Sequence, residues 1–128
     1  MFQIFLAALV AAIATASPAA AAQYLPFDRA TFDAAQAAGQ PVLVDVAAWW
    51  CPVCFSQERT IRETTSAPEF ARLTIFKINY DQEKPEWKRF GVTKQATLIA
   101  FKGGREIGRI AYQTNKMQIR DLLAAAVR

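Results

Sequence analysis

The sequence predicts an α/β fold in which a mixed central β-sheet is flanked by helices on both faces. Short runs of β-branched and aromatic residues alternate with segments of helical periodicity along most of the 128 residues. Toward the C-terminus, two strand-like segments follow each other directly and a last helix closes the chain. Alternating strands and helices that end in such an antiparallel pair give a mixed sheet covered on both sides.

The first 22 residues contain no charged side chain and end in a run of small residues from Ser17 to Ala22. This pattern predicts a secretory signal peptide cut after Ala22, which leaves one domain, residues 23–128. Since the apolar run approaches spanning length and no Lys or Arg precedes it, an uncleaved membrane anchor is the alternative. With either a cleaved signal peptide or an uncleaved anchor, we expect a periplasmic or secreted protein whose cysteines lie in an oxidising compartment.

The next segments predict an edge strand, a helix and a buried strand. The stretch 24–27 contains a proline, which strands tolerate at sheet edges. Asp28 is a suitable N-cap for a helix that runs to about Ala38 and turns Phe32 inward. The apolar, β-branched run 42–47 then reads as a buried strand.

The middle of the chain predicts three helices and one strand. The first helix begins at Cys51 and runs to about Thr64. Ser66, followed three residues later by Glu69, has the pattern of a second helix start. The apolar residues of 75–78 form the next buried strand, and the charged stretch 81–90 a short helix.

The last third predicts a hairpin and a closing helix. Strands at 97–102 and 106–112 are joined through Gly103-Gly104, a dipeptide typical of tight turns. Asn115 caps a final helix whose apolar stripe should face the core. That predicted stripe consists of Met117, Ile119, Leu122, Leu123 and Ala126.

The main candidate site is the pair Cys51 and Cys54, which the buried strand delivers to the start of a helix. Pro52 suits the first turn, and the positive end of the helix dipole favours a thiolate on Cys51. This arrangement predicts a redox pair. A purely structural disulfide is one alternative, although so short a loop stabilises weakly. A metal site is the other, but the chain has no histidine and no further cysteine to complete a tetrahedral shell.

The stretch 41–54, Pro-Val-Leu-Val-Asp-Val-Ala-Ala-Trp-Trp-Cys-Pro-Val-Cys, resembles the active-site region of thioredoxin-like thiol–disulfide oxidoreductases. Residues 73–81 are similar to that family's central strand, and residues 90–104 to its substrate-loop strand and hairpin. The resemblance covers residues 28–127. It implies a thioredoxin-like fold and disulfide exchange with other proteins, without a cofactor and without a metal.

The resemblance also implies roles for two charged residues. Asp45 stands six residues before Cys51, where the family has a buried acid beneath the second cysteine. Burial should raise its pKa, so that it accepts a proton near neutral pH. Lys77 matches a family lysine near that acid, which implies that it steers the ionisation of Asp45, and a surface lysine is the alternative.

Substrate contacts are expected on both sides of the cysteines. They involve Trp50, Pro52 and Val53 on one side and the loop Gln95, Ala96 and Thr97 on the other. The family carries a cis-proline where this chain has Ala96, so a trans peptide is expected between Gln95 and Ala96. Tyr112 stands near a position where the family often has a glycine, and its ring would narrow the groove.

In the implied mechanism, Cys51 is the more exposed thiol and attacks a substrate disulfide, and Cys54 resolves the mixed disulfide. The substrates are exported proteins, and a membrane electron donor or a quinone-linked oxidant resets the pair. Val53 offers no charge or hydrogen bond to a thiolate, which favours a reductant. A disulfide-donating oxidase, a Cu(I)-binding module and a client-tethering chaperone remain alternatives. Lys and Arg are scattered, and nothing indicates a nucleic-acid partner.

Overall fold

The computed structural model describes residues 11–15 and 21–128 of the chain. Most of the predicted signal peptide therefore lies outside the described residues. None of the helices formed by the described residues is both long enough and apolar enough to cross a membrane.

The predicted mixed sheet is confirmed, with five strands in the order β1-β3-β2-β4-β5. Its parallel part consists of β1 (Gln23–Pro26), β3 (Thr74–Asn79) and β2 (Val42–Ala47). The antiparallel part follows with β4 (Thr97–Lys102) and β5 (Arg105–Ala111). The central strand β2 thus lies between the two parts, and the segment that carries both cysteines follows it directly.

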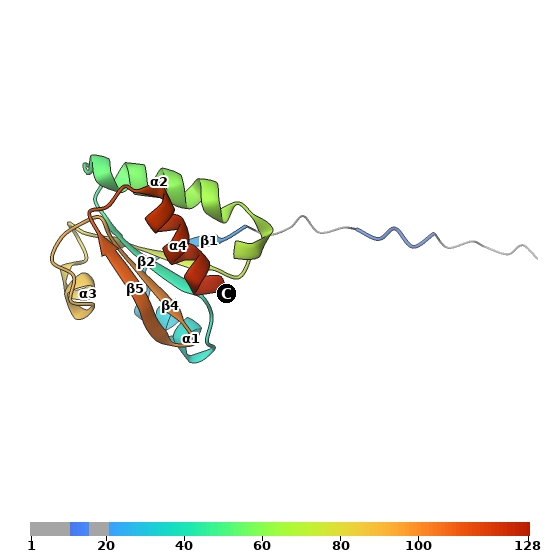
Figure 1. Cartoon of the computed structure of the whole chain (residues 1–128). Coiled ribbons are helices and arrows are strands. Elements are labelled where there is room, and N and C mark those ends of the chain that lie inside the picture. The colour runs from blue at the N-terminus through green and yellow to red at the C-terminus, as the bar shows by residue number, and fades with distance from the viewer. Residues whose placement is uncertain (1–10, 16–20) are drawn as a thin grey trace, which may run out of the picture.

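Helices cover both faces of the sheet, as the sequence predicts (Figure 1). On one face lie α2 (Pro52–Thr65) and α4 (Lys116–Val127), whose apolar residues pack with Leu43, Ile75 and Leu98. On the other face lie α1 (Arg29–Ala37) and α3 (Lys84–Arg89), which pack against Val44, Val46 and Phe76. Neighbouring residues of β2 therefore serve opposite cores, as the pleat of a strand requires.

Two predicted helix starts are wrong because side chains form local bonds instead. The Ser66 hydroxyl donates back to Glu63 O, and only one turn of 3₁₀-helix, Pro68–Phe70, follows. At the start of the predicted helix 81–90, the Asn79 side chain accepts from the N–H groups of Asp81 and Gln82. Because of this turn, α3 begins only at Lys84.

One residue of the predicted apolar stripe on α4 is also misplaced. Met117 is 71% exposed, whereas Ile119, Leu123 and Ala126 are buried. Successive helix residues are rotated by about 100°, so Met117 points about 200° away from Ile119. Leu122 packs at the margin of the same core.

Candidate active site

The two cysteines occupy the first turn of α2, at the end of the loop after β2. Cys51 is the N-cap and Pro52 the first helical residue, which agrees with the sequence prediction. Cys51 and Cys54 form a disulfide, and the backbone N–H of Cys54 donates to the Cys51 sulfur at 3.1 Å. After reduction, the same N–H and the helix dipole would stabilise a thiolate on Cys51.

Both cysteines are buried in the disulfide form. Cys51 is 1% exposed and Cys54 is 4% exposed, so the expectation that Cys51 is the more exposed residue is wrong for this state. The reason is that Ala48 and Ala96 pack with the two cysteines in one small apolar cluster. Ala96, which the sequence aligns with the family's proline, therefore does lie beside the disulfide.

The backbone of Ala96 has an unusual conformation. Its φ angle of 60° lies in the left-handed region, and every described peptide bond is trans, as expected for the Gln95–Ala96 bond. The Ala96 N–H donates to Val46 O at 2.7 Å, and the Ala96 carbonyl accepts from the N–H of Tyr112 at 2.8 Å. Both backbone groups of Ala96 are thus used within the protein.

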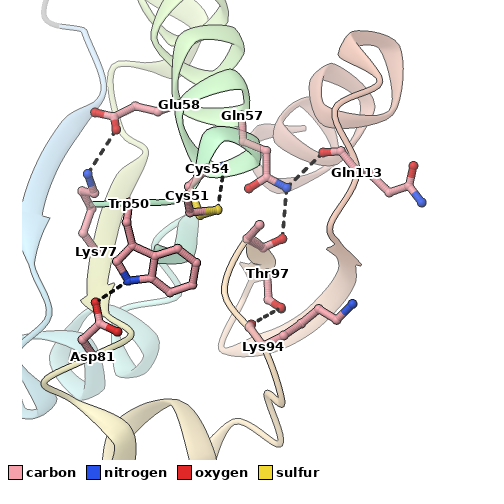
Figure 2. The surroundings of a disulfide bond; sticks show 11 residues. Trp50, Cys51, Cys54, Gln57, Glu58, Lys77, Asp81, Lys94, Thr97 and Gln113 are labelled. Carbon is pink, nitrogen blue, oxygen red and sulfur yellow. Dashed lines mark hydrogen bonds and ion pairs between the residues drawn. A yellow bond between two sulfur atoms is a disulfide. The ribbon is translucent and has the colours of Figure 1, made fainter. Parts of the chain in front are cut away.

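A residue that the sequence reasoning missed joins this loop to α2. Gln57 is fully buried, and its Nε2 donates to Ala96 O and to Gln113 O, each at 3.0 Å. Figure 2 shows its side chain extending from α2 toward the segments that carry Thr97 and Gln113. A polar residue one helical turn after Cys54 is the signal that could have indicated it.

Asp45 is buried in the middle of the sheet. It is 2% exposed and lies on the face covered by α2, between Lys77 on β3 and Leu98 on β4. Burial raises the pKa of Asp45 to about 7, the positive charge of Lys77 opposes this rise, and the negative charge of Glu58 adds to it. The carboxyl group can therefore hold a proton at neutral pH and release it just above.

Lys77 does not bond to Asp45, its neighbour in the sheet. Its Nζ donates to Glu58 Oε2 at 3.2 Å, and the other carboxylate oxygen of Glu58 accepts from Arg62 Nη2 at 2.8 Å. Burial alone would raise the pKa of Glu58, but the bonds from Arg62 and Lys77 hold it below its ordinary value. Glu58 therefore stays ionised and draws the lysine toward α2.

A groove of about 510 Å³ opens beside the disulfide, toward β1 and β3. Its wall includes Cys54, the Glu58–Lys77 pair, and the side chains of Trp49 and Phe55, both more than half exposed. Among the described residues, no three His, Cys, Asp or Glu side chains are grouped as a metal site would require.

Comparison with known proteins identifies the family. The sequence model of the family described as Thioredoxin matches residues 23–125. The chain is 34% identical to a thioredoxin of Alicyclobacillus acidocaldarius subsp. acidocaldarius over 95 residues, which cover 74% of this chain and 90% of that protein. The chain belongs to the thioredoxin family.

Further thioredoxin-family relatives agree with this assignment. Protein disulfide-isomerase erp38 of Neurospora crassa is 31% identical over 121 residues, which are 84% of this chain and 33% of that protein. The crystal structure of Trxlp from Edwardsiella tarda EIB202 has a TM-score of 0.76 and 40% identity, over 79% of this chain and 98% of that one. With the Cys-x-x-Cys disulfide, these relatives confirm the predicted fold and the thiol–disulfide oxidoreductase activity of this thioredoxin-family chain.

The other residues predicted to contact substrates of this thioredoxin-family chain differ in exposure. Trp50 is 46% exposed, and its Nε1 donates to Asp81 Oδ2 at 2.9 Å, which fixes the ring beside the disulfide (Figure 2). Pro52 is exposed, and Val53 and Gln95 are half-buried.

Thr97 and Tyr112 both adjoin Ala96 in this thioredoxin fold, but Thr97 is buried and Tyr112 lies at the surface. Thr97 is buried and its hydroxyl donates to Lys94 O at 2.9 Å, so it supports the loop from inside. Tyr112 is 47% exposed and has a φ of 59°, and the ammonium of Lys94 lies 4.6 Å from its ring centroid. The surface next to Ala96 therefore carries an aromatic ring and a positive charge.

Proposed function

We propose that this thioredoxin-family oxidoreductase is exported and reduces disulfide bonds in other envelope proteins. The observation that carries the reductant assignment is the environment of the Cys51 sulfur. Among the described residues, its one hydrogen bond comes from the N–H of Cys54. Pro52 and Val53 add no charge and no side-chain donor. A thiolate stabilised only by this N–H and the helix dipole makes the reduced form less stable than further charges or donors would, which lowers the reduction potential of the pair.

Support for export comes from the amino-acid sequence alone. The first 22 residues have no charged side chain and end in small residues, the composition of a secretory signal peptide. An exported reductant needs a source of electrons outside the cytoplasm, and a membrane electron donor meets that need.

The chemistry proceeds in two exchange steps. The Cys51 thiolate attacks one sulfur of a substrate disulfide, forms a mixed disulfide and releases the other substrate sulfur as a thiolate. Cys54 then gives its proton to the carboxylate of Asp45 and attacks the Cys51 sulfur. The mixed disulfide breaks, the second substrate sulfur leaves as a thiolate, and the Cys51–Cys54 disulfide remains. Two electrons have passed from the dithiol to the substrate.

The reduction potential of the purified protein tests the direction. The protein is equilibrated with glutathione at defined ratios, and the fraction of Cys51–Cys54 disulfide is measured by thiol alkylation and mass spectrometry. We expect a value near that of thioredoxin, about −270 mV. A value near that of a strong oxidant, about −120 mV, would overturn the reductant assignment and favour a disulfide donor.

Cell fractionation tests the export. The full-length chain is expressed in a Gram-negative host, and the recovered protein is sequenced from its N-terminus. We expect a soluble periplasmic protein that begins at Gln23. Recovery of the uncut chain in the membrane fraction would show an anchor instead, and recovery in the cytoplasm would contradict export.

A further inference from the structure

The buried side chain of Gln57 joins three segments that are far apart in the sequence. It projects from α2, and its Nε2 donates to the carbonyls of Ala96, before β4, and Gln113, after β5 (Figure 2). Because both partners are acceptors, the orientation of the amide is determined. The opposite orientation would place Oε1 against two carbonyl oxygens, and neither carbonyl would receive a hydrogen bond from Gln57.

This orientation leaves the other end of the amide unused. Gln57 Oε1 is buried and has no hydrogen-bond partner among the described residues. A buried acceptor without a donor costs stability, and an apolar side chain of the same shape would avoid that cost. Such a side chain would also give up both bonds from Nε2, so what the glutamine adds is the link between α2 and the carbonyls of Ala96 and Gln113.

Two of the segments that Gln57 joins contain a residue in the left-handed conformation, and one of these residues, Ala96, packs against the disulfide. Ala96 and Tyr112 have φ angles of 60° and 59°, a conformation that residues other than glycine adopt at an energetic cost. The N–H of Tyr112 donates to the same Ala96 carbonyl that Gln57 holds. One side chain thus fixes both segments to the helix that carries Cys51 and Cys54.

The loop held in this way presents free backbone groups. Gln95, next to Ala96, has no hydrogen-bond partner among the described residues for its N–H or its carbonyl. Ala96 itself packs against both cysteines. An extended peptide that pairs with Gln95 would lie across the disulfide, so the position of this loop decides how well a protein substrate docks.

We infer that Gln57 is a positioning residue for protein substrates, because it holds the Ala96 loop at the distance from Cys51 and Cys54 that docking requires. The inference rests on the mixed-disulfide step proposed above. It does not depend on the direction of electron flow, since docking precedes the exchange in both directions. A measured potential typical of an oxidant would therefore overturn the reductant assignment and leave this inference standing.

The test compares a protein substrate with a small one. In Gln57→Met, both bonds from Nε2 are lost while the shape of the side chain is nearly kept. With insulin as substrate, we expect KM to rise and kcat/KM to fall about tenfold. A tenfold fall corresponds to a loss of about 1.4 kcal/mol of binding free energy. With the small disulfide 5,5′-dithiobis(2-nitrobenzoic acid), which needs no backbone pairing, we expect the rate to stay within about twofold.

A matched control separates docking from general loosening of the helix. Thr65→Val removes a buried hydroxyl from the same helix, but its bond goes to Ile61 O, within α2, at 2.8 Å. We expect this variant to lower the melting temperature without changing the KM for insulin. An equal rise of KM in both variants would overturn the inference. So would an unchanged KM in Gln57→Met, or a parallel fall of both rates.

A second variant keeps the test decisive if Gln57→Met does not fold. In Gln57→Glu, the buried carboxyl group lies against two carbonyls and donates one hydrogen bond only when it is protonated. The KM for insulin, relative to wild type, should be raised more at pH 8 than at pH 6. A ratio that does not change with pH would overturn the inference.

Discussion

Replacing Asp45 with Asn should make the oxidised protein more stable at neutral and alkaline pH. The wild-type carboxyl group is buried, and its pKa is raised by that burial from 3.8 to about 7. Between these two values, the folded protein keeps a proton that the unfolded chain releases. The stability that this bound proton contributes is therefore fully present below about pH 4 and is lost as the pH rises through about 7. Asn has a similar shape and cannot ionise.

The size of the effect follows from the pKa shift. Each pKa unit corresponds to about 1.4 kcal/mol, so a shift from 3.8 to about 7 amounts to about 4 kcal/mol above pH 7. The free energy of unfolding of Asp45→Asn minus that of wild type should rise with pH by about 1.4 kcal/mol per unit in this interval. Above about pH 7 the difference should level off. Any constant cost of burying the amide shifts this curve without changing its slope.

Urea unfolding, followed by tryptophan fluorescence from pH 4 to pH 9, measures this difference with the disulfide intact. Asp33→Asn is the matched control, because Asp33 is an exposed carboxylate on α1. Exposed substitutions of this kind change stability by about 0.5 kcal/mol or less. A difference for Asp45→Asn that stays constant above pH 5 would refute the reasoning, since it would mean that the buried carboxyl group ionises as if it were in water.

Two further substitutions test the surroundings of the disulfide. In Glu58→Gln, the pKa of Asp45 should fall, because the charge of Glu58 raises that pKa and its bond holds Lys77. NMR titration of the Asp45 carboxyl carbon measures the midpoint, and an unchanged midpoint would contradict this prediction. Ala96→Pro should cost about 2 kcal/mol or more in urea unfolding, because proline cannot adopt a φ of 60° or donate to Val46 O. If Ala96→Pro were as stable as wild type, the left-handed turn at Ala96 would be excluded.

The sequence was sufficient for the order of the elements and for the redox pair. The run 42–47 is apolar and bounded by turn residues, and the residues after it carry both cysteines and a proline suited to the first turn of α2. These signals are local, because a strand or a helix start depends on residues within one or two turns of each other. The burial of Asp45 was an expectation from the family resemblance, because its strand neighbours Val44 and Val46 point to the opposite face of the sheet.

The helix start predicted at Ser66 failed, and the bonding partner of Lys77 could not be chosen from the sequence, because each side chain has more than one possible partner. Ser66 can cap a helix that follows it or bond to the helix that precedes it, and the structure contains the second bond. Lys77 can bond to Asp45 or to a residue of the covering helix, and Glu58 on α2 provides the alternative. Sequence spacing does not decide between such partners, because each choice depends on which groups the packing brings within reach.

The sequence by itself determined a mixed sheet flanked by helices, with a dithiol at the start of α2, because periodicity and turn chemistry are properties of neighbouring residues. Only the tertiary structure decided that Cys51 is as buried as Cys54 in the disulfide form, and that Gln57 holds the Ala96 loop. These features join residues 39 to 56 positions apart in the chain. They exist only after the sheet has brought those segments together. A local pattern can mark Gln57 as an unusual polar residue, but it cannot name the partners of its side chain.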